Sequence, residues 1–305
     1  MTLALLFPGP GSQYVGMGKA LAEGFASARD TLEEADSVLG LPLSTLMADG
    51  PEEELTATKN AQPAILAHSV AVLRVVGERL GSVALAAGHS LGEFSAHVAA
   101  GTFSFRDALE AVRLRGELMY QAGLERPGTM AAVLGLDDAA LRAVCARVDA
   151  GICVPANFNS SGQIVISGDL AGIEQGMALA TEAGAKRVVR LNVSGAFHSP
   201  LMAPAARGLR EHLETTTFAD PAYPVISNVT AGPVASGADA RDLLVEQLTS
   251  PVRWAESVAA MVEAGADRFL ELGPGSVLGG LNRRNARGLP CTSLGEAADL
   301  EAFEV

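Results

Sequence analysis

The 305-residue sequence is poor in cysteine, in aromatic residues and in positive charge. Its three cysteines, Cys145, Cys153 and Cys291, include no C-x-x-C pair and leave one over, so the sequence predicts neither a disulfide framework nor a metal site. This cysteine usage favours a reducing compartment, and we expect a cytoplasmic protein. The formal net charge of −13 argues against nucleic acid or an anionic membrane as the main partner.

Long apolar runs are missing as well. No uninterrupted run approaches the roughly 20 residues that span a bilayer. The amino terminus has no basic stretch, and its apolar segment stops at Pro8. Residues 3–7 are therefore predicted to form a first buried strand rather than a signal peptide, and we expect a soluble protein.

Glycine is plentiful, with 33 residues against only three tyrosines and one tryptophan. This balance favours an α/β enzyme with many tight strand-to-helix turns over a lectin-like sandwich. A chain of this length can bury a large core in one or two domains, and we expect it to act as a monomer.

The stretch Gly88-His89-Ser90-Leu91-Gly92-Glu93 follows an apolar run at 83–87 and precedes a helix-compatible segment. This order predicts a strand, a sharp turn and a helix, in which side chains at positions 88 and 92 would collide with the backbone. The Ser90 hydroxyl would then stand near the amino end of a helix, and the Leu91 N–H would point to where an oxyanion forms. The alternative is a glycine-rich turn that happens to contain a serine, because the bare pattern is weakly specific.

A helix predicted at 104–121, capped by Ser104, carries one arginine on an unexpected face. Charged residues repeat along one side of this helix, whereas Arg115 falls on the opposite, apolar side. A guanidinium there is costly without an anionic partner. Either a buried Asp or Glu satisfies Arg115, or Arg115 lines a pocket and binds a substrate carboxylate.

Between residues 128 and 193 the pattern changes. Strands are predicted at 130–134, 152–156, 163–167 and 187–191, and helices at 138–148 and 170–183. This β-α-β-β-α-β order is the ferredoxin-like arrangement. We therefore predict a small ferredoxin-like domain at 128–193, inserted into a larger domain formed by 1–127 and 194–305.

The larger part is predicted to alternate strands and helices. Residues 8–13 form a glycine-rich strand-to-helix loop that lacks the G-K-[ST] ending of a phosphate-binding loop. Gln62-Pro63 is predicted to start a helix at 62–80. Further strands are expected at 224–227 and 268–272, and the chain end from Glu296 is expected to be frayed.

A serine nucleophile needs a base near neutral pH. Four of the five histidines are most simply structural, solvated or turned away from Ser90: His68, His89, His97 and His212. His198 is the best candidate, because it lies on a glycine-flanked loop where Ser199 can cap a helix and Pro200 can begin it. No acidic third member is identifiable, and a backbone carbonyl could orient the imidazole instead.

Four motifs occur in order along the chain: Phe7-Pro8-Gly9-x-Gly11-Ser12-Gln13, Gly88-His89-Ser90-Leu91-Gly92-Glu93, Arg115-Gly116 and Ala196-Phe197-His198-Ser199. In this order and spacing they resemble the malonyl-CoA:acyl-carrier-protein transacylases. The likeness extends over nearly the whole chain and includes Asn157-x-Asn159-Ser160, Ala185-Lys186-Arg187, Gln247-x-x-x-Pro251-Val252 and Glu271-x-Gly273-Pro274-Gly275. The fold of that family, an α/β-hydrolase-like domain with a ferredoxin-like insertion, agrees with the predicted elements.

The resemblance implies a ping-pong acyl transfer. Ser90 would attack the thioester of malonyl-CoA, His198 would act as base and then as acid, and the main-chain carbonyl of Gln247 would hold the imidazole. Arg115 would bind the malonyl carboxylate, with Gln62 and Asn159 as further substrate-binding residues. The acyl group would then pass to the phosphopantetheine thiol of an acyl carrier protein, with no bound cofactor or metal.

One residue departs from the family pattern. The first loop of the family usually reads G-Q-G-S-Q, and the N–H of its first glutamine is an oxyanion donor, whereas this chain has Pro10, which has no N–H. Losing one such donor costs about 10²–10³ in rate. We expect the Gly11 N–H or a water to take over, or the enzyme to be slow.

Phe197 resembles the malonyl-selective pattern, because a bulky ring there would crowd a branched extender, although a size filter contributes only about 1–3 kcal/mol per methylene. Two alternative functions are an editing hydrolase of acyl carrier proteins, against which Arg115 argues, and a docking module without turnover, which only Pro10 favours.

Docking of an acidic carrier needs positive charge. Two clusters could supply it, or could be no more than solvated faces: Lys186, Arg187 and Arg190, and Arg283, Arg284 and Arg287.

Overall fold

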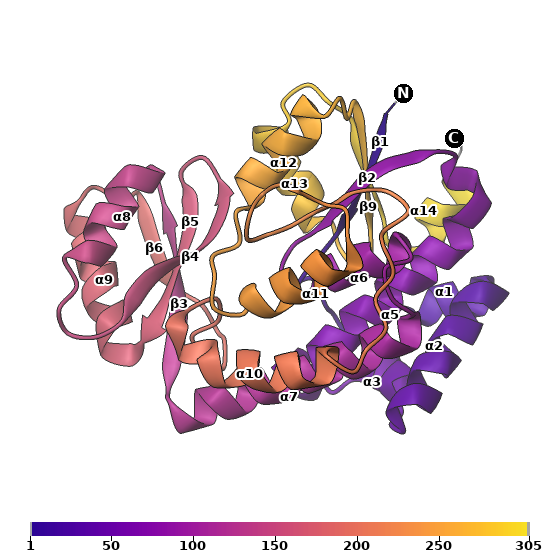
Figure 1. Cartoon of the computed structure of the whole chain (residues 1–305), viewed down its shortest axis with the longest axis horizontal. Helices are drawn as coiled ribbons and strands as arrows, with labels where there is room; N and C mark the ends of the chain where they lie inside the picture. The colour runs from indigo at the N-terminus through magenta and orange to yellow at the C-terminus, as the bar shows by residue number, and fades with distance from the viewer. Residues whose placement is uncertain (1, 304–305) are drawn as a thin grey trace.

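The chain forms two β-sheets with helices packed against both, an α/β fold (Figure 1). The computed structural model describes residues 2–303. The smaller sheet and its two helices lie at one end of the molecule, and the larger sheet lies at the other. The long helix α7 (Phe105–Glu125) runs from the larger part into the first strand of the smaller sheet.

The larger sheet has six strands in the order β10-β9-β1-β2-β7-β8. Their bounds are β1 Leu3–Phe7, β2 Val83–Gly88, β7 Val225–Ile226, β8 Pro233–Val234, β9 Arg268–Leu272 and β10 Cys291–Leu294. All neighbours are parallel except β7 and β8. Leu5 and Phe7 of β1 join one buried cluster, whereas Ala4 and Leu6 join another, as the two-residue period of a strand requires. Both faces of the sheet are therefore covered, which is typical of parallel sheets.

Helices cover both faces of this sheet. The carboxyl-terminal helices α12 (Trp254–Glu263) and α13 (Val277–Asn285) supply side chains to the cluster around Ala4 and Leu6. The remaining helices of the larger part are α1 Lys19–Gly24, α2 Ala26–Leu39, α3 Leu43–Asp49, α4 Glu52–Thr56, α5 Thr58–Val76, η1 Gly77–Leu80, α6 Gly92–Ala99, η2 Pro200–Met202, α10 Ala203–Leu213, α11 Gly237–Glu246 and α14 Ala297–Ala302.

The start of α5 corrects a prediction. The helix begins at Thr58 and not at Gln62, so Pro63 lies inside it. Proline cannot donate to the carbonyl four residues earlier, which belongs to Lys59. Arg113 of α7 donates to that carbonyl instead, at 3.1 Å, so a side chain from the neighbouring helix compensates for the proline.

The smaller sheet follows the predicted β-α-β-β-α-β order. Its elements are β3 Gly128–Leu134, α8 Asp138–Ala146, β4 Cys153–Ser160, β5 Gln163–Asp169, α9 Leu170–Glu182 and β6 Arg187–Arg190. The strands are ordered β4-β5-β3-β6 and every pair is antiparallel. Alternate residues of the central strands, such as Ala131, Val133 and Ile166, form one buried cluster beneath α8 and α9.

Strand β4 also contacts the carboxyl-terminal part of the chain. Val252, just before α12, accepts a hydrogen bond from Phe158 N–H and donates one to Ala156 O, each at 2.8 Å. Asn285, at the end of α13, donates through Nδ2 to Asn159 O at 2.8 Å. These hydrogen bonds hold β4 beside the carboxyl-terminal helices.

The end of the chain corrects a second prediction. Residues from Glu296 onward are not frayed over the described part, because α14 forms there. Glu296 and Asp299 make a reciprocal capping box, and Leu300 and Phe303 are buried. Residues 304 and 305 lie outside the described residues.

Candidate active site

Ser90 stands on the predicted sharp turn between β2 and α6. Its backbone has a φ of 52°, in the left-handed region that few non-glycine residues adopt. A Cβ atom added to Gly88 would lie 1.8 Å from the carbonyl carbon of Gly92, and one added to Gly92 would lie 2.1 Å from Phe7 O. The two glycines are therefore required by close backbone contacts, which confirms the steric part of the prediction.

Asn228, in the loop between β7 and β8, forms two hydrogen bonds to the backbone of this turn. Its Oδ1 accepts from Ser90 N–H and its Nδ2 donates to Gly88 O, both at 2.7 Å. Because the two backbone partners differ in kind, they fix the orientation of the amide. Asn228 thereby braces a strained turn whose geometry would otherwise relax.

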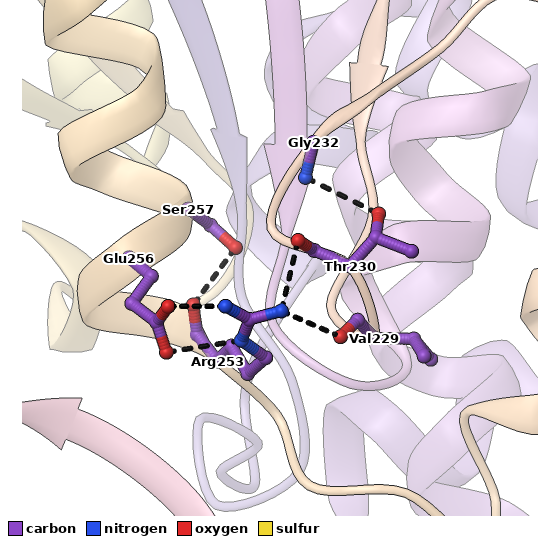
Figure 2. A network of polar contacts seen from close by, with 6 residues as sticks. All are labelled: Val229, Thr230, Gly232, Arg253, Glu256 and Ser257. Carbon is purple, nitrogen blue, oxygen red and sulfur yellow. Dashed lines mark hydrogen bonds and ion pairs between the residues drawn. The ribbon is translucent and has the colours of Figure 1, made fainter.

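The loop that carries Asn228 is held in turn by Arg253 (Figure 2). The Arg253 guanidinium donates to Thr230 O at 3.0 Å and to Val229 O at 3.4 Å, and it pairs with Glu256 through two nitrogens. Arg253 N–H also donates to Asn228 O at 3.0 Å. The start of α12 thus supports the Ser90 turn through one intervening loop.

His198 meets Ser90 as the sequence predicted. Ser90 Oγ lies 2.8 Å from His198 Nε2, and His198 Nδ1 lies 2.9 Å from the main-chain oxygen of Gln247. A carbonyl oxygen only accepts, so Nδ1 carries the proton and Nε2 is left to accept from the serine hydroxyl. Burial and the nearby charge of Arg115 lower the pKa of His198 to about 3, so the ring is neutral near pH 7.

Arg115 is fully buried on the apolar face of α7 and reaches the same centre. Its Nη1 donates to Gln62 Oε1 at 2.5 Å, and its Nη2 donates to Ser90 Oγ at 3.2 Å and to Gln247 Oε1 at 2.9 Å. The Nε atom is buried and has no partner among the described residues. The sequence left open a buried acid or a pocket as the reason for this arginine, and no carboxylate of residues 2–303 forms an ion pair with it.

A buried carboxylate, Glu93, is separated from Arg115 by the side chain of Gln247. Glu93 Oε2 accepts from Gln247 Nε2 at 2.7 Å and from Asn228 N–H at 3.1 Å. Burial raises the pKa of Glu93 to about 7, partly offset by these hydrogen bonds and by the charge of Arg115. Burial likewise lowers the pKa of Arg115 to about 10, against the attraction of Glu93. The Gln247 amide therefore connects a buried carboxylate to a buried guanidinium and keeps them apart.

A cavity of about 840 Å³ opens in front of Ser90. Several predicted site residues lie on its wall: Pro10, Gly11, Gln62, Ser90, Phe197 and His198. Arg115 lies behind Gln62 and Ser90, and Leu91 is buried at the start of α6. A cleft of this size suits a small-molecule substrate.

Two predicted residues lie where their expected roles have no support. Asn159 does not line the cavity, and its Oδ1 instead lies 2.8 Å from His89 Nε2. Gly11 N–H donates to Gln13 Oε1 at 2.8 Å, so it is not free to replace the N–H that Pro10 lacks. In each case a neighbouring polar side chain, which local sequence does not reveal, takes the group.

The proposed docking residues are all exposed. Lys186, Arg187 and Arg190 lie on or beside β6, the edge strand of the smaller sheet, and residues 191–194 directly after it line the cavity. Arg283 and Arg284 lie in the last turn of α13, and Arg287 follows it. Arg190 thus directly precedes a segment of the cavity wall in the sequence.

Sequence reasoning missed Glu93, Asn228 and the side chain of Gln247. Glu93 was part of a quoted motif, and its place in the first turn of a buried helix could have identified it. Asn228 carries no local signal, because its role depends on a loop that is distant in sequence from Ser90. Within residues 2–303 no group of three or more His, Cys, Asp or Glu side chains is arranged to hold a metal ion, and no helix is both long and apolar enough to cross a membrane.

Comparisons with a family model and with curated proteins agree with one another. A family model described as an acyl transferase domain matches residues 4–299. The malonyl CoA-acyl carrier protein transacylase of Bacillus subtilis is 47% identical over 301 residues, which cover 98% of this chain and 95% of the relative. That of Escherichia coli K12 is 43% identical, with 98% and 97% covered.

Solved structures agree with these relatives. An acyl carrier protein S-malonyltransferase from Vibrio cholerae has a TM-score of 0.94 at 44% identity and covers 99% of each chain. A malonyl-transacylase solved in complex with a type II polyketide synthase acyl-carrier protein has a TM-score of 0.95 at 43% identity, with 99% and 98% covered. Together with a serine, an imidazole and a guanidinium at one centre, these matches show that the chain belongs to the acyl transferase family.

Proposed function

We propose that this enzyme moves a malonyl group from malonyl-CoA to the phosphopantetheine thiol of an acyl carrier protein, through an acyl-enzyme on Ser90. The observation that carries this proposal is the convergence on Ser90 Oγ of His198 Nε2 at 2.8 Å and Arg115 Nη2 at 3.2 Å. A base beside the hydroxyl makes it a nucleophile, and a cation beside it selects a substrate with a negative charge near the reacting carbonyl.

Acylation uses these groups in a fixed order. Ser90 Oγ forms a bond to the thioester carbon while its proton passes to His198 Nε2, and the carbonyl electron pair moves onto oxygen. The Leu91 N–H is placed to donate to that oxyanion. When the carbonyl reforms, the carbon–sulfur bond breaks and the coenzyme A sulfur takes the proton from His198.

Deacylation repeats the sequence with a different thiol. The phosphopantetheine thiol gives its proton to His198 and attacks the Ser90 ester, and the proton returns to Ser90 Oγ as that bond breaks. Gln247 O keeps the proton on Nδ1 throughout, so the imidazole always presents Nε2 to the reaction. No bound cofactor is needed, because coenzyme A and phosphopantetheine arrive with the two substrates.

Arg115 is proposed to bind the malonyl carboxylate. Three of the five donors on its guanidinium are engaged, by Gln62, Ser90 and Gln247. The two donors that remain, one on Nη1 beside Gln62 and one on Nε, are left for the two carboxylate oxygens. Phe197, on the cavity wall, is proposed to favour malonyl over branched extenders.

We further propose that the two sheets are two domains. Residues 1–127 and 194–305 would form an α/β-hydrolase-like domain, and 128–193 a ferredoxin-like insertion, with the cleft at their border. Its support is the strand order of each sheet and the position of residues 191–194 on the cavity wall. An acidic carrier would dock on the exposed cluster Lys186, Arg187 and Arg190, with Arg283 and Arg284 as a second contact.

Steady-state kinetics test this function. With malonyl-CoA and a holo carrier varied together, a ping-pong enzyme gives parallel double-reciprocal lines. Ser90→Ala should abolish transfer and leave folding unchanged. Free malonate released faster than malonyl carrier would support the hydrolase alternative, and tight carrier binding without turnover would support a docking module.

A further inference from the structure

The loop after β1 is pressed against the Ser90 turn. His89 N–H donates to Phe7 O at 3.0 Å, and a Cβ atom added to Gly9 would lie 2.3 Å from His89 O. Pro10, Gly11 and Gln13 of this loop share the cavity wall with Ser90. In enzymes with a serine on such a turn, a second oxyanion donor comes from a loop that follows another strand. The loop at 8–13 is placed to supply that donor.

The backbone of this loop at Pro10 and Gly11 has no free N–H to donate to an oxyanion. Pro10 has no N–H. Gly11 N–H points back to Gln13 Oε1, and the φ of 100° at Gly11 is a conformation that glycine adopts without strain. The hydroxyl of Ser12 donates to Gly9 O at 2.8 Å.

Gly9 and Ser12 do not line the cavity, whereas Gln13 does, and its side-chain amide is a further donor on that wall. A backbone N–H can only donate, so the atom that accepts from Gly11 must be Oε1, and the orientation of the amide is fixed by chemistry. Its Nε2 then carries two N–H groups, and these have no acceptor among residues 2–303. Gln13 is half-buried on the wall of the same cleft that Ser90 lines.

We propose that Gln13 Nε2 supplies the second oxyanion hydrogen bond, in place of the backbone N–H that proline removes. This inference rests on the proposed acyl transfer through Ser90. As the Ser90 Oγ–carbon bond forms and the proton moves to His198, the carbonyl electron pair becomes an alkoxide between Leu91 N–H and Gln13 Nε2. Gln13 is thus a catalytic residue, and the Gly11 N–H keeps its amide preorganised.

Two variants separate the donor from the loop. Gln13→Glu keeps an acceptor for Gly11 N–H and removes the donor, whereas Gln13→Met removes both. The readout is the single-turnover rate of coenzyme A release, with the KM for malonyl-CoA measured beside it. Each variant should lose about 10²–10³ in rate with little change in KM, because the bond exists only in the transition state.

Rescue makes the test independent of a structural effect. Pro10→Gln restores a backbone N–H, so it should recover at least about tenfold in rate in both Gln13 backgrounds and gain less than about threefold in the wild-type background. Asn157→Ala is the matched control, because Asn157 is another amide on the cavity wall but lies on β4. Pro10→Gln should not rescue any loss that Asn157→Ala causes.

Two results would overturn the inference. The first is a rate within about threefold of wild type for both Gln13 variants. The second is a loss in the Gln13 variants that Pro10→Gln fails to recover, which would assign Gln13 to loop shape alone. Absence of any acyl-enzyme in the wild-type protein would instead refute the proposed function, and intact mass measured on the same samples distinguishes the two failures.

Discussion

Replacing Arg115 by methionine should change which acyl group the enzyme accepts. Methionine is similar in length and apolar, so it fills the buried site without a charge. Two donors of the guanidinium, one on Nη1 and one on the buried Nε, make no hydrogen bond within residues 2–303 and are left for a substrate. Hydrogen bonds to charged groups contribute about 1.5–3 kcal/mol each, so two of them amount to about 3–6 kcal/mol. Arg115→Met should therefore lower kcat/KM for malonyl-CoA by about 10²–10⁴.

Acetyl-CoA provides the internal control, because it has the same thioester and no carboxylate. We expect its kcat/KM to change by less than about tenfold, so the ratio of malonyl to acetyl turnover collapses. A loss of fold would lower both rates equally, and this ratio is insensitive to it. Rapid-quench acylation with each substrate, supported by a thermal melt, measures the effect. Equal losses for malonyl-CoA and acetyl-CoA would refute the assignment of Arg115 to the carboxylate and make it a structural residue.

Four further predictions follow from single contacts. Gly88→Ala should lower the free energy of unfolding by more than about 3 kcal/mol, because the new Cβ would overlap Gly92. Gly280 is exposed in α13 with open space around it, so Gly280→Ala should raise the free energy of unfolding by about 0.5–1 kcal/mol. Similar melting temperatures for the two variants would contradict this. Asn228→Ala should lower the acylation kcat by about 10–100-fold with the KM unchanged, since Ser90 N–H loses its acceptor; a change in KM alone would argue otherwise. Arg190→Glu should raise the KM for the carrier but not for malonyl-CoA, and the difference should shrink at high salt. His68→Leu should stabilise the protein by about 1–3 kcal/mol at pH 7, because both ring nitrogens of His68 are buried and neither has a hydrogen-bond partner within residues 2–303. Burial lowers the pKa of His68 to about 3, so the wild type loses stability as the pH falls below the unfolded value of about 6.5, and urea unfolding should show the gap to the variant widening there.

Much of this arrangement was readable from local sequence. The glycines around Ser90 and the cap at Ser104 are local steric and hydrogen-bonding requirements, and both were predicted. The position of Arg115 followed from the helical period, which places it on the buried face of α7. The order of strands and helices at 128–193 followed from alternating patterns and was confirmed.

The failures share a physical cause. Pro63 is tolerated inside α5 because Arg113, from another helix, satisfies the carbonyl that proline leaves free. The acidic end after Glu296 is ordered because Leu300 finds a buried site against the larger sheet. Asn228 holds Ser90 across a long separation in sequence, and such pairings follow from tertiary packing rather than local pattern. Site residues that act through a distant loop could not be predicted from one sequence.

The most direct test of the account is to map the acyl-enzyme. The protein is incubated with malonyl-CoA in the absence of any carrier, quenched in acid and digested, and the modified peptide is sequenced by mass spectrometry. One malonyl group should appear on Ser90, should be absent from Ser90→Ala, and should disappear when a holo carrier is added before the quench. A malonyl group on another residue, or turnover without any covalent intermediate, would contradict the central claim that Ser90, His198 and Arg115 form one acyl-transfer centre.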